Sequence, residues 1–97
     1  MKLTNCRALV TGASAGIGRE FARQLAPDAE LLVLVARRAD RLEELRTELQ
    51  SAYPNLRVEI HPADLEREED IRMLLEWIES ERSAIDLLVN NAGLGDL

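Results

Sequence analysis

Short apolar runs of strand length recur along the chain, separated by amphipathic stretches. Cys6 to Thr11 is a short apolar run that predicts a first strand. Leu31 to Ala36 is continuously apolar, which is typical of a central parallel strand covered on both faces. Val58 and Ile60 alternate with charged residues in a third predicted strand, and Ile85 to Val89 make a fourth. The chain therefore carries four candidate strands.

The three stretches between these strands have apolar residues at helical spacing. The predicted buried faces are Ile17, Phe21 and Leu25 in the first helix, Leu42, Leu45 and Leu49 in the second, and Ile71, Leu74, Leu75 and Ile78 in the third. Asp40 is a candidate N-cap of the second helix, with Glu43 completing a capping box. Acidic residues from Glu66 to Asp70 favour the start of the third helix, because negative charge stabilises a helix N-terminus.

Strands and helices thus alternate in the order βαβαβαβ. The connections are too long for hairpins, so the pattern predicts a parallel sheet with helices on both faces. Right-handed crossovers restrict the fold to α/β, a Rossmann-like doubly wound parallel sheet with strand order 3-2-1-4. We interpret residues 1–97 as one dinucleotide-binding, Rossmann-type domain that is incomplete at its C-terminal side.

Composition and charge narrow the function classes. The chain is 46% hydrophobic and 31% charged, as expected for a globular domain, and its formal charge of −6 argues against nucleic-acid binding. It contains no apolar run of membrane-spanning length and no secretory signal at its N-terminus. Cys6 is the single cysteine and is expected to be a small buried strand residue. These features predict a cytoplasmic protein without membrane or nucleic-acid partners.

A glycine-rich loop, Thr11-Gly12-Ala13-Ser14-Ala15-Gly16-Ile17-Gly18, joins the first predicted strand to the first helix. A helix N-terminus offers unpaired N–H groups and positive potential to a phosphate. By position, Gly12 permits a tight turn, Gly16 a close approach of backbone to pyrophosphate, and Gly18 close packing of helix on strand, while Ser14 adds a hydroxyl donor. A mononucleotide P-loop would require Gly-Lys-Ser/Thr where Ile17-Gly18-Arg19 stand.

The end of the second strand predicts the cofactor. An acid there would bond a ribose 2′-hydroxyl and repel a 2′-phosphate, but Ala36 occupies that position and Arg37 and Arg38 follow it. A guanidinium forms charge-assisted bonds to phosphate, so the sequence favours NADP, with NAD as the weaker ligand. The competing interpretation is that both arginines are solvated charges at the start of a polar loop.

Two further strand ends carry candidate contacts. Asp64 follows the third strand, where its carboxylate would accept hydrogens from the adenine amino group, or would cap the acidic helix behind it. Asn90 and Gly93 follow the fourth strand, and the small residues Ala92 and Gly93 would leave room for the nicotinamide ribose. The alternative for the asparagines is a simple turn at a strand end. No metal site is predicted, because the single histidine, His61, has no second candidate ligand and is expected in a surface turn.

Three motifs together resemble the short-chain dehydrogenase/reductase family: T-G-x-x-x-G-I-G at residues 11–18, Asp64-Leu65 after the third strand, and N-N-A-G at residues 90–93. The resemblance implies an NADP-dependent oxidoreductase that moves a hydride between the nicotinamide and a carbonyl or alcohol substrate. It also implies that Ile17 and Leu65 belong to the cofactor site, and that the full-length protein is a homo-oligomer. In the family, arginine at the position of Arg37 accompanies NADP. Some NADP-dependent members also carry a basic residue where Ala15 stands here.

The catalytic residues of that family, a serine and a Tyr-x-x-x-Lys pair, follow the N-N-A-G segment. The single tyrosine, Tyr53, has no lysine four residues on, and the single lysine is Lys2. No catalytic residue is therefore assigned, and the 97 residues alone are expected to be inactive. Two alternatives belong to other classes: a free-standing, non-catalytic dinucleotide-binding module, and a methyltransferase using S-adenosylmethionine. The missing acid at Ala36 and the presence of Arg37 argue against the methyltransferase.

Overall fold

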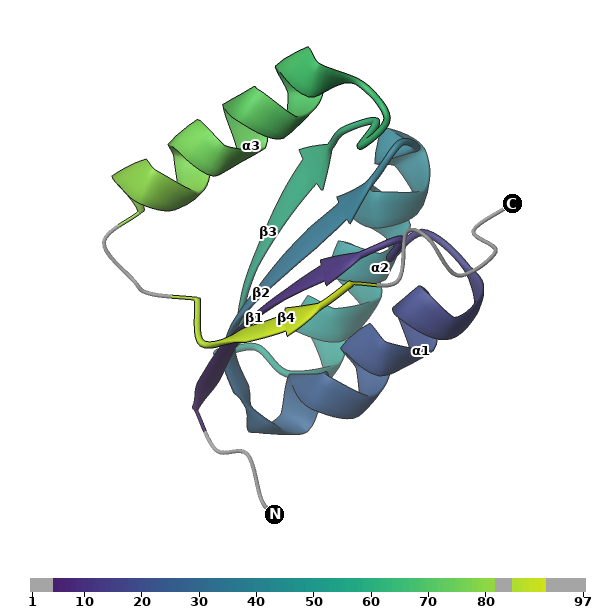
Figure 1. The fold of residues 1–97 in the computed structure, drawn as a ribbon. Coiled ribbons are helices and arrows are strands. Elements are labelled where there is room, and N and C mark those ends of the chain that lie inside the picture. Colours follow the sequence, from purple (N-terminus) through teal and green to yellow (C-terminus); the bar gives the residue numbers. More distant parts are fainter. Residues whose placement is uncertain (1–4, 82–84, 91–97) are drawn as a thin grey trace.

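In the part of the chain that the structure describes, four strands alternate with three α-helices (Figure 1). The structure is a computed structural model, and it describes residues 5–81 and 85–90. The elements are β1 (Cys6–Thr11), α1 (Gly16–Leu25), the short 3₁₀ helix η1 (Ala26–Asp28), β2 (Ala29–Ala36), α2 (Ala39–Ala52), β3 (Arg57–Pro62), α3 (Glu68–Ser80) and β4 (Leu87–Val89).

The strands form one parallel sheet in the order β3-β2-β1-β4. Val10 lies beside Leu34 of β2 on one side and beside Val89 of β4 on the other. This is the predicted Rossmann-like topology with strand order 3-2-1-4. Because all four strands run in the same direction, their carboxyl ends, and the loops that follow, meet at one edge of the sheet.

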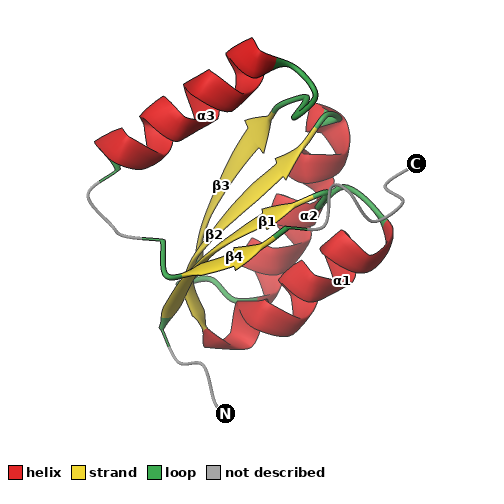
Figure 2. Ribbon diagram, viewed as in Figure 1, coloured by secondary structure: helices red, strands yellow, loops and turns green. Residues whose placement is uncertain are grey.

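Helices cover both faces of the sheet, with α1 and α2 on one side and α3 on the other (Figure 2). Leu31 to Ala36 are all buried, as expected for a central strand between two helical layers. On the face of α1 and α2, Leu42, Leu45 and Leu49 pack against the sheet, as predicted. On the other face, Leu74 and Trp77 of α3 pack over Leu9, Leu31 and Val33. Cys6 is buried in β1, also as predicted.

The predicted buried face of α1 is wrong for two of its three residues. Ile17 is 59% exposed and Phe21 is 44% exposed, whereas Gly18 and Ala22 are buried. Small residues let the helix backbone lie close to the sheet, so the larger side chains on the neighbouring side of α1 project outward. Leu25 does pack against the core.

The face predicted for α3 is also only partly buried. Leu74 and Ile78 pack on the sheet, but Ile71 is 37% exposed and Leu75 is 54% exposed. Trp77, one residue before Ile78, also packs against this face of the sheet. A stripe read from spacing alone is wider than the part of the helix that a four-stranded sheet covers.

The predicted capping box of α2 is absent. The helix begins at Ala39 with Arg38 as its N-cap, so Asp40 lies inside the first turn, and Asp40 binds Arg38 while Glu43 pairs with Arg46. Strand β4 is also shorter than predicted and begins at Leu87.

The reason for the short strand is a side-chain contact at its start. The Asp86 carboxylate accepts the Arg7 amide at 2.9 Å, and the Asp86 amide donates to the Arg7 carbonyl at 2.9 Å. The Asp86 side chain thus occupies the Arg7 amide, which the backbone of a longer β4 would otherwise bind.

Candidate functional site

The loop between β1 and α1 turns sharply at two glycines. Gly12 has φ +66° and Gly16 has φ +57°, a left-handed backbone conformation that L-residues with side chains rarely adopt. The loop is anchored to the neighbouring strand, because the Ala13 amide donates to the Val35 carbonyl at 3.2 Å. Ser14 is half-buried in the same loop. The roles of Gly12 and Gly16 in the turn thus have a direct backbone reason.

The N-terminus of α1 is open to an anion. Its N-cap, Ala15, offers no side-chain hydrogen bond, and its first turn holds no acidic residue. A Cβ built on Gly16 would have no neighbouring atom within 4 Å, so the space in front of this backbone is open. Gly18, two residues further along α1, is buried. The unpaired N–H groups and the helix dipole therefore face an accessible space, which suits a phosphate.

A small pocket lies at the carboxyl ends of three strands. It encloses about 80 Å³, too little for a whole dinucleotide. Its lining residues are Gly12, Val35, Ala36, Arg37, Ala63, Asp64, Leu65 and Glu66. The Ala63 amide donates to the Ala36 carbonyl at 2.8 Å, which holds the β3–α3 loop beside the tip of β2. The pocket thus gathers predicted site residues from three separate loops.

The two arginines after β2 differ in their surroundings. Arg37 lines the pocket, and no ion pair or hydrogen bond of its side chain is found among residues 5–81 and 85–90. Arg38 instead forks onto Asp40, with Nε 3.2 Å from Oδ1 and an Nη 2.8 Å from Oδ2. These hydrogen bonds hold the pKa of Asp40 below its ordinary value. The structure brings Arg37 to the pocket and does not bring Arg38 there.

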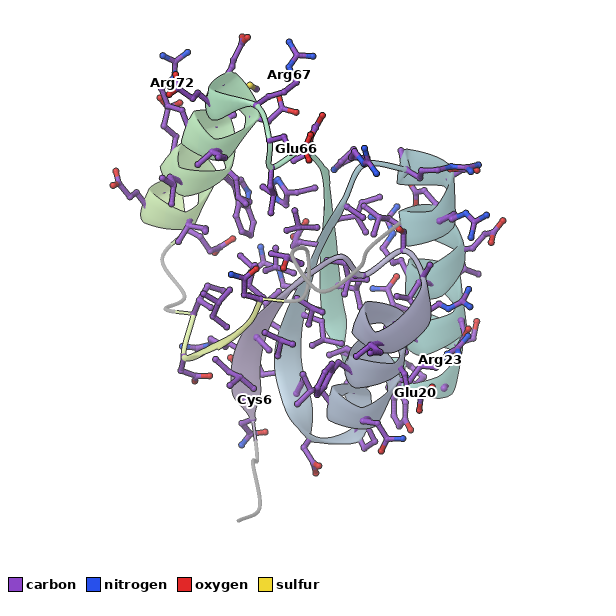
Figure 3. All side chains as sticks on the ribbon, turned by 45° about the vertical axis from the view of Figure 1, so that its right-hand side comes forward. Cys6, Glu20, Arg23, Glu66, Arg67 and Arg72 are labelled. Atoms are coloured by element: carbon purple, nitrogen blue, oxygen red, sulfur yellow. The ribbon has the colours of Figure 1, made fainter. Side chains whose placement is uncertain are left out.

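Asp64 organises the loop that forms the opposite wall. Its Oδ1 accepts the Glu66 amide at 3.0 Å, and its own amide donates to Asp70 Oδ2 at 2.8 Å. Helix α3 begins after Arg67, so Asp64 caps a turn before the helix and the predicted helix-capping role is wrong. Figure 3 shows Glu66 on this loop, close to the N-terminal end of α3 marked by Arg67 and Arg72.

The ends of β1 and β4 are joined by a contact that the sequence did not predict. The Thr11 hydroxyl donates to Asn90 Oδ1 at 3.1 Å, and Thr11 is buried. Asn90 therefore reaches back to the base of the glycine loop. Thr11, a polar residue at the end of an apolar strand, is the feature of the sequence that could have indicated this contact. The predicted contacts Ala92 and Gly93 lie outside the described residues.

His61 is part of β3, so its predicted place in a surface turn is wrong. Its ring centroid lies 4.2 Å from that of Trp77, and burial lowers its pKa. Within the described part of the chain, no group of three potential metal-ligating side chains is found. The helices in that part are too short or too polar to cross a lipid bilayer.

The parallel sheet in the order 3-2-1-4, with a glycine loop opening the first helix, defines a Rossmann-like α/β protein. The model of the short chain dehydrogenase family matches residues 7–97. The chain belongs to the short-chain dehydrogenase/reductase family.

Relatives and solved structures agree with this assignment. Farnesol dehydrogenase from Aedes aegypti is 42% identical over 88 residues, which are 90% of this chain and 35% of that protein. The structure of L-sorbose reductase from Gluconobacter frateurii, complexed with NADPH and L-sorbose, superposes with a TM-score of 0.85 at 36% identity and covers 98% of this chain and 36% of the reductase. A metagenomic short-chain oxidoreductase in complex with NADP gives a TM-score of 0.78 at 31% identity, covering 89% of this chain and 38% of its own.

The shared region is a similar fraction of each of these proteins. The chain spans a little over a third of the length of the curated relatives that it matches. The likeness therefore describes the part of these proteins that contains the glycine loop and the first four strands.

Proposed function

We propose that this chain is the cofactor-binding portion of an NADP(H)-dependent oxidoreductase that interconverts a carbonyl and an alcohol. The observation that carries the proposal is the juxtaposition of the open, acid-free N-terminus of α1 with a pocket lined by Arg37, whose guanidinium has no ion-pair partner among the described residues. The first feature suits the pyrophosphate, and the second suits a 2′-phosphate on the adenosine ribose. Similar structures with NADPH and with NADP support the same choice of cofactor.

Residues from four strand ends would hold the cofactor. The amides of Gly16, Ile17 and Gly18 would face the pyrophosphate, with Ser14 adding a hydroxyl. Arg37 would bind the 2′-phosphate, and Asp64 with Leu65 would flank the adenine. On the far side, Asn90, Ala92 and Gly93 would border the nicotinamide ribose. When bound, NADPH supplies the hydride that reduces the carbonyl group.

The 97 residues contain no Tyr-x-x-x-Lys pair, because Arg57 stands four residues after the single tyrosine, Tyr53. Tyr53 lies after α2 near the amino ends of the strands, beside Pro54 and Asn55. We therefore propose that these 97 residues bind NADP(H) without reducing any substrate.

A substitution at Gly16 tests whether the phosphates lie on the loop. Gly16→Val should abolish NADPH binding with limited loss of fold, because a branched side chain would fill the open space in front of the helix. Binding isotherms and far-UV circular dichroism measure the two effects separately.

Gly16→Ala is the matched control. It carries much of the same backbone strain at positive φ but adds a single methyl group, so its loss of affinity should be clearly smaller than that of valine. Retained affinity in Gly16→Val would mean that the phosphates bind elsewhere. Parallel losses of helicity and binding in both variants would assign the effect to the fold instead.

A further inference from the structure

The first turn of α2 places a carboxylate close to the proposed 2′-phosphate site. Asp40 follows Arg37 by three residues, so their Cα atoms are at most about 11 Å apart. Asp64 and Glu66 already line the pocket opposite Arg37. A third acid at this end of the molecule would weaken the attraction of a doubly charged phosphate.

Arg38 is positioned to cancel that third acid. Its guanidinium meets both carboxylate oxygens of Asp40 in a two-pronged contact, at 3.2 Å and 2.8 Å, and it is absent from the pocket lining. Asp40 in turn sits in the first turn of α2, where a negative charge stabilises the helix dipole. Because Arg38 neutralises Asp40, the carboxylate can stabilise the N-terminus of α2 while its negative charge is screened from the pocket.

We propose that Arg37 alone contacts the 2′-phosphate, and that Arg38 raises NADP affinity indirectly, by neutralising Asp40 beside it. The inference rests on the proposed function. Arg38 is then a positioning residue. The NADP preference of the chain depends on three residues: Arg37 binds the phosphate, Asp40 repels it, and Arg38 neutralises the charge of Asp40.

A double-mutant cycle on the protein tests this division of roles, with NADPH and NADH as the probes. Arg38→Ala should weaken NADPH binding about three- to tenfold and change NADH binding less than about twofold, because only NADPH carries the extra phosphate. Arg38→Ala combined with Asp40→Asn should restore NADPH affinity to within about twofold of the wild type, since both charges are then gone. Arg38→Lys should retain most of the affinity, because the neutralising charge remains.

Arg46→Ala is the matched control. It removes an arginine from the same helix that is likewise paired with an acid, Glu43, but it lies further along α2. Its NADPH affinity should stay within about twofold of the wild type. A purely structural role of Arg38 would lower NADPH and NADH binding together, and circular dichroism would report the loss of helix.

Two results would overturn the inference while leaving the proposed function intact. One is an unchanged NADPH affinity in Arg38→Ala. The other is a double variant that binds NADPH as weakly as Arg38→Ala, which would show that Arg38 contacts the phosphate itself. A wild type that binds NADPH no better than NADH would instead refute the proposed cofactor choice, and this inference with it.

Discussion

Two backbone hydrogen bonds place the candidate site at the scale of single residues. The Ala13 amide binds the Val35 carbonyl, and the Ala63 amide binds the Ala36 carbonyl. Both loops are thereby fastened to the tip of β2, from which Arg37 follows. Each such bond contributes a net of about 0.5–1.5 kcal/mol, so the loops are held where the sheet ends. The pocket is a consequence of these contacts between loops as much as of the side chains that line it.

The sequence predicts four of the residues that line this pocket, Gly12, Arg37, Asp64 and Leu65, but not their partners. Arg37, Asp64 and Gly12 were predicted because their positions after strands are fixed by the order of elements. The ion pair between Arg38 and Asp40 cannot be predicted from the sequence, because a contact between side chains two residues apart depends on where α2 begins. The same helix start, with Arg38 rather than Asp40 as the N-cap, removes the predicted capping box.

His61 makes the stability of the fold depend on pH. Burial, with the ring against Trp77, lowers the pKa of His61 below its ordinary value of about 6.5, and the charge of Glu59 opposes the shift. The folded state therefore disfavours the protonated ring, and the unfolded chain takes up the proton first as the pH falls. The resulting contribution is present above pH 6.5 and is lost as the pH drops through the lowered pKa of the folded state.

The free energy of unfolding, measured by urea denaturation between pH 7.5 and 5.5, checks this prediction. It should fall more steeply with decreasing pH in the wild type than in His61→Phe, which keeps a ring against Trp77 but has no proton to gain. Identical slopes in the two proteins would contradict the assignment of this pH dependence to His61. Both proteins share all carboxylates, so their common acid titration cancels in the comparison.

At the scale of elements, the strands were predicted better than the helix faces. A continuous apolar run such as Leu31 to Ala36 has one explanation, burial on both faces, and the structure confirms it. An apolar stripe on a helix does not say how much of it the sheet covers. In α1 the buried contacts are Gly18 and Ala22, whose small size carries no hydrophobic signal, while Phe21 remains 44% exposed.

The two edges of the sheet differ in their protection. Strand β3 carries Arg57 and Glu59, and Arg57 is further held by Glu81 at 2.8 Å. Strand β4, at the other edge, consists of Leu87, Leu88 and Val89, and Leu88 is 62% exposed. Charged residues discourage pairing with another chain, whereas an apolar edge is a template for it. The β4 edge is therefore the predicted surface of association.

We expect the 97-residue polypeptide to self-associate, and Leu88→Lys to shift it toward the monomer, because a lysine on an edge strand opposes pairing. Size-exclusion chromatography with light scattering measures both. Met73→Lys is the control, since Met73 is equally exposed, at 60%, but lies on α3 beside His61 and Pro62. A well-folded monomeric wild type would contradict this prediction. An equal response to both lysines would show a general effect of charge.

At the scale of the whole molecule, the net negative charge means that cofactor binding depends on a few local positive groups. The formal charge of −6 repels any dinucleotide at long range. Attraction therefore has to come from two local groups, the N-terminus of α1 and Arg37. The first turn of α1 holds no acidic residue, and the Arg37 guanidinium has no carboxylate partner among the described residues. The preference for a phosphorylated ribose therefore depends on very few groups, and a single substitution should remove it.

Affinities of the wild type and of Arg37→Ala for NADPH and NADH test this most directly. The wild type should bind NADPH at least about tenfold more tightly than NADH, because one charge-assisted bond contributes about 1.5–3 kcal/mol. Arg37→Ala should lose that difference and keep its NADH affinity within about twofold. A wild type without preference, or a variant that loses affinity equally for both cofactors, would contradict the assignment of Arg37 to the 2′-phosphate.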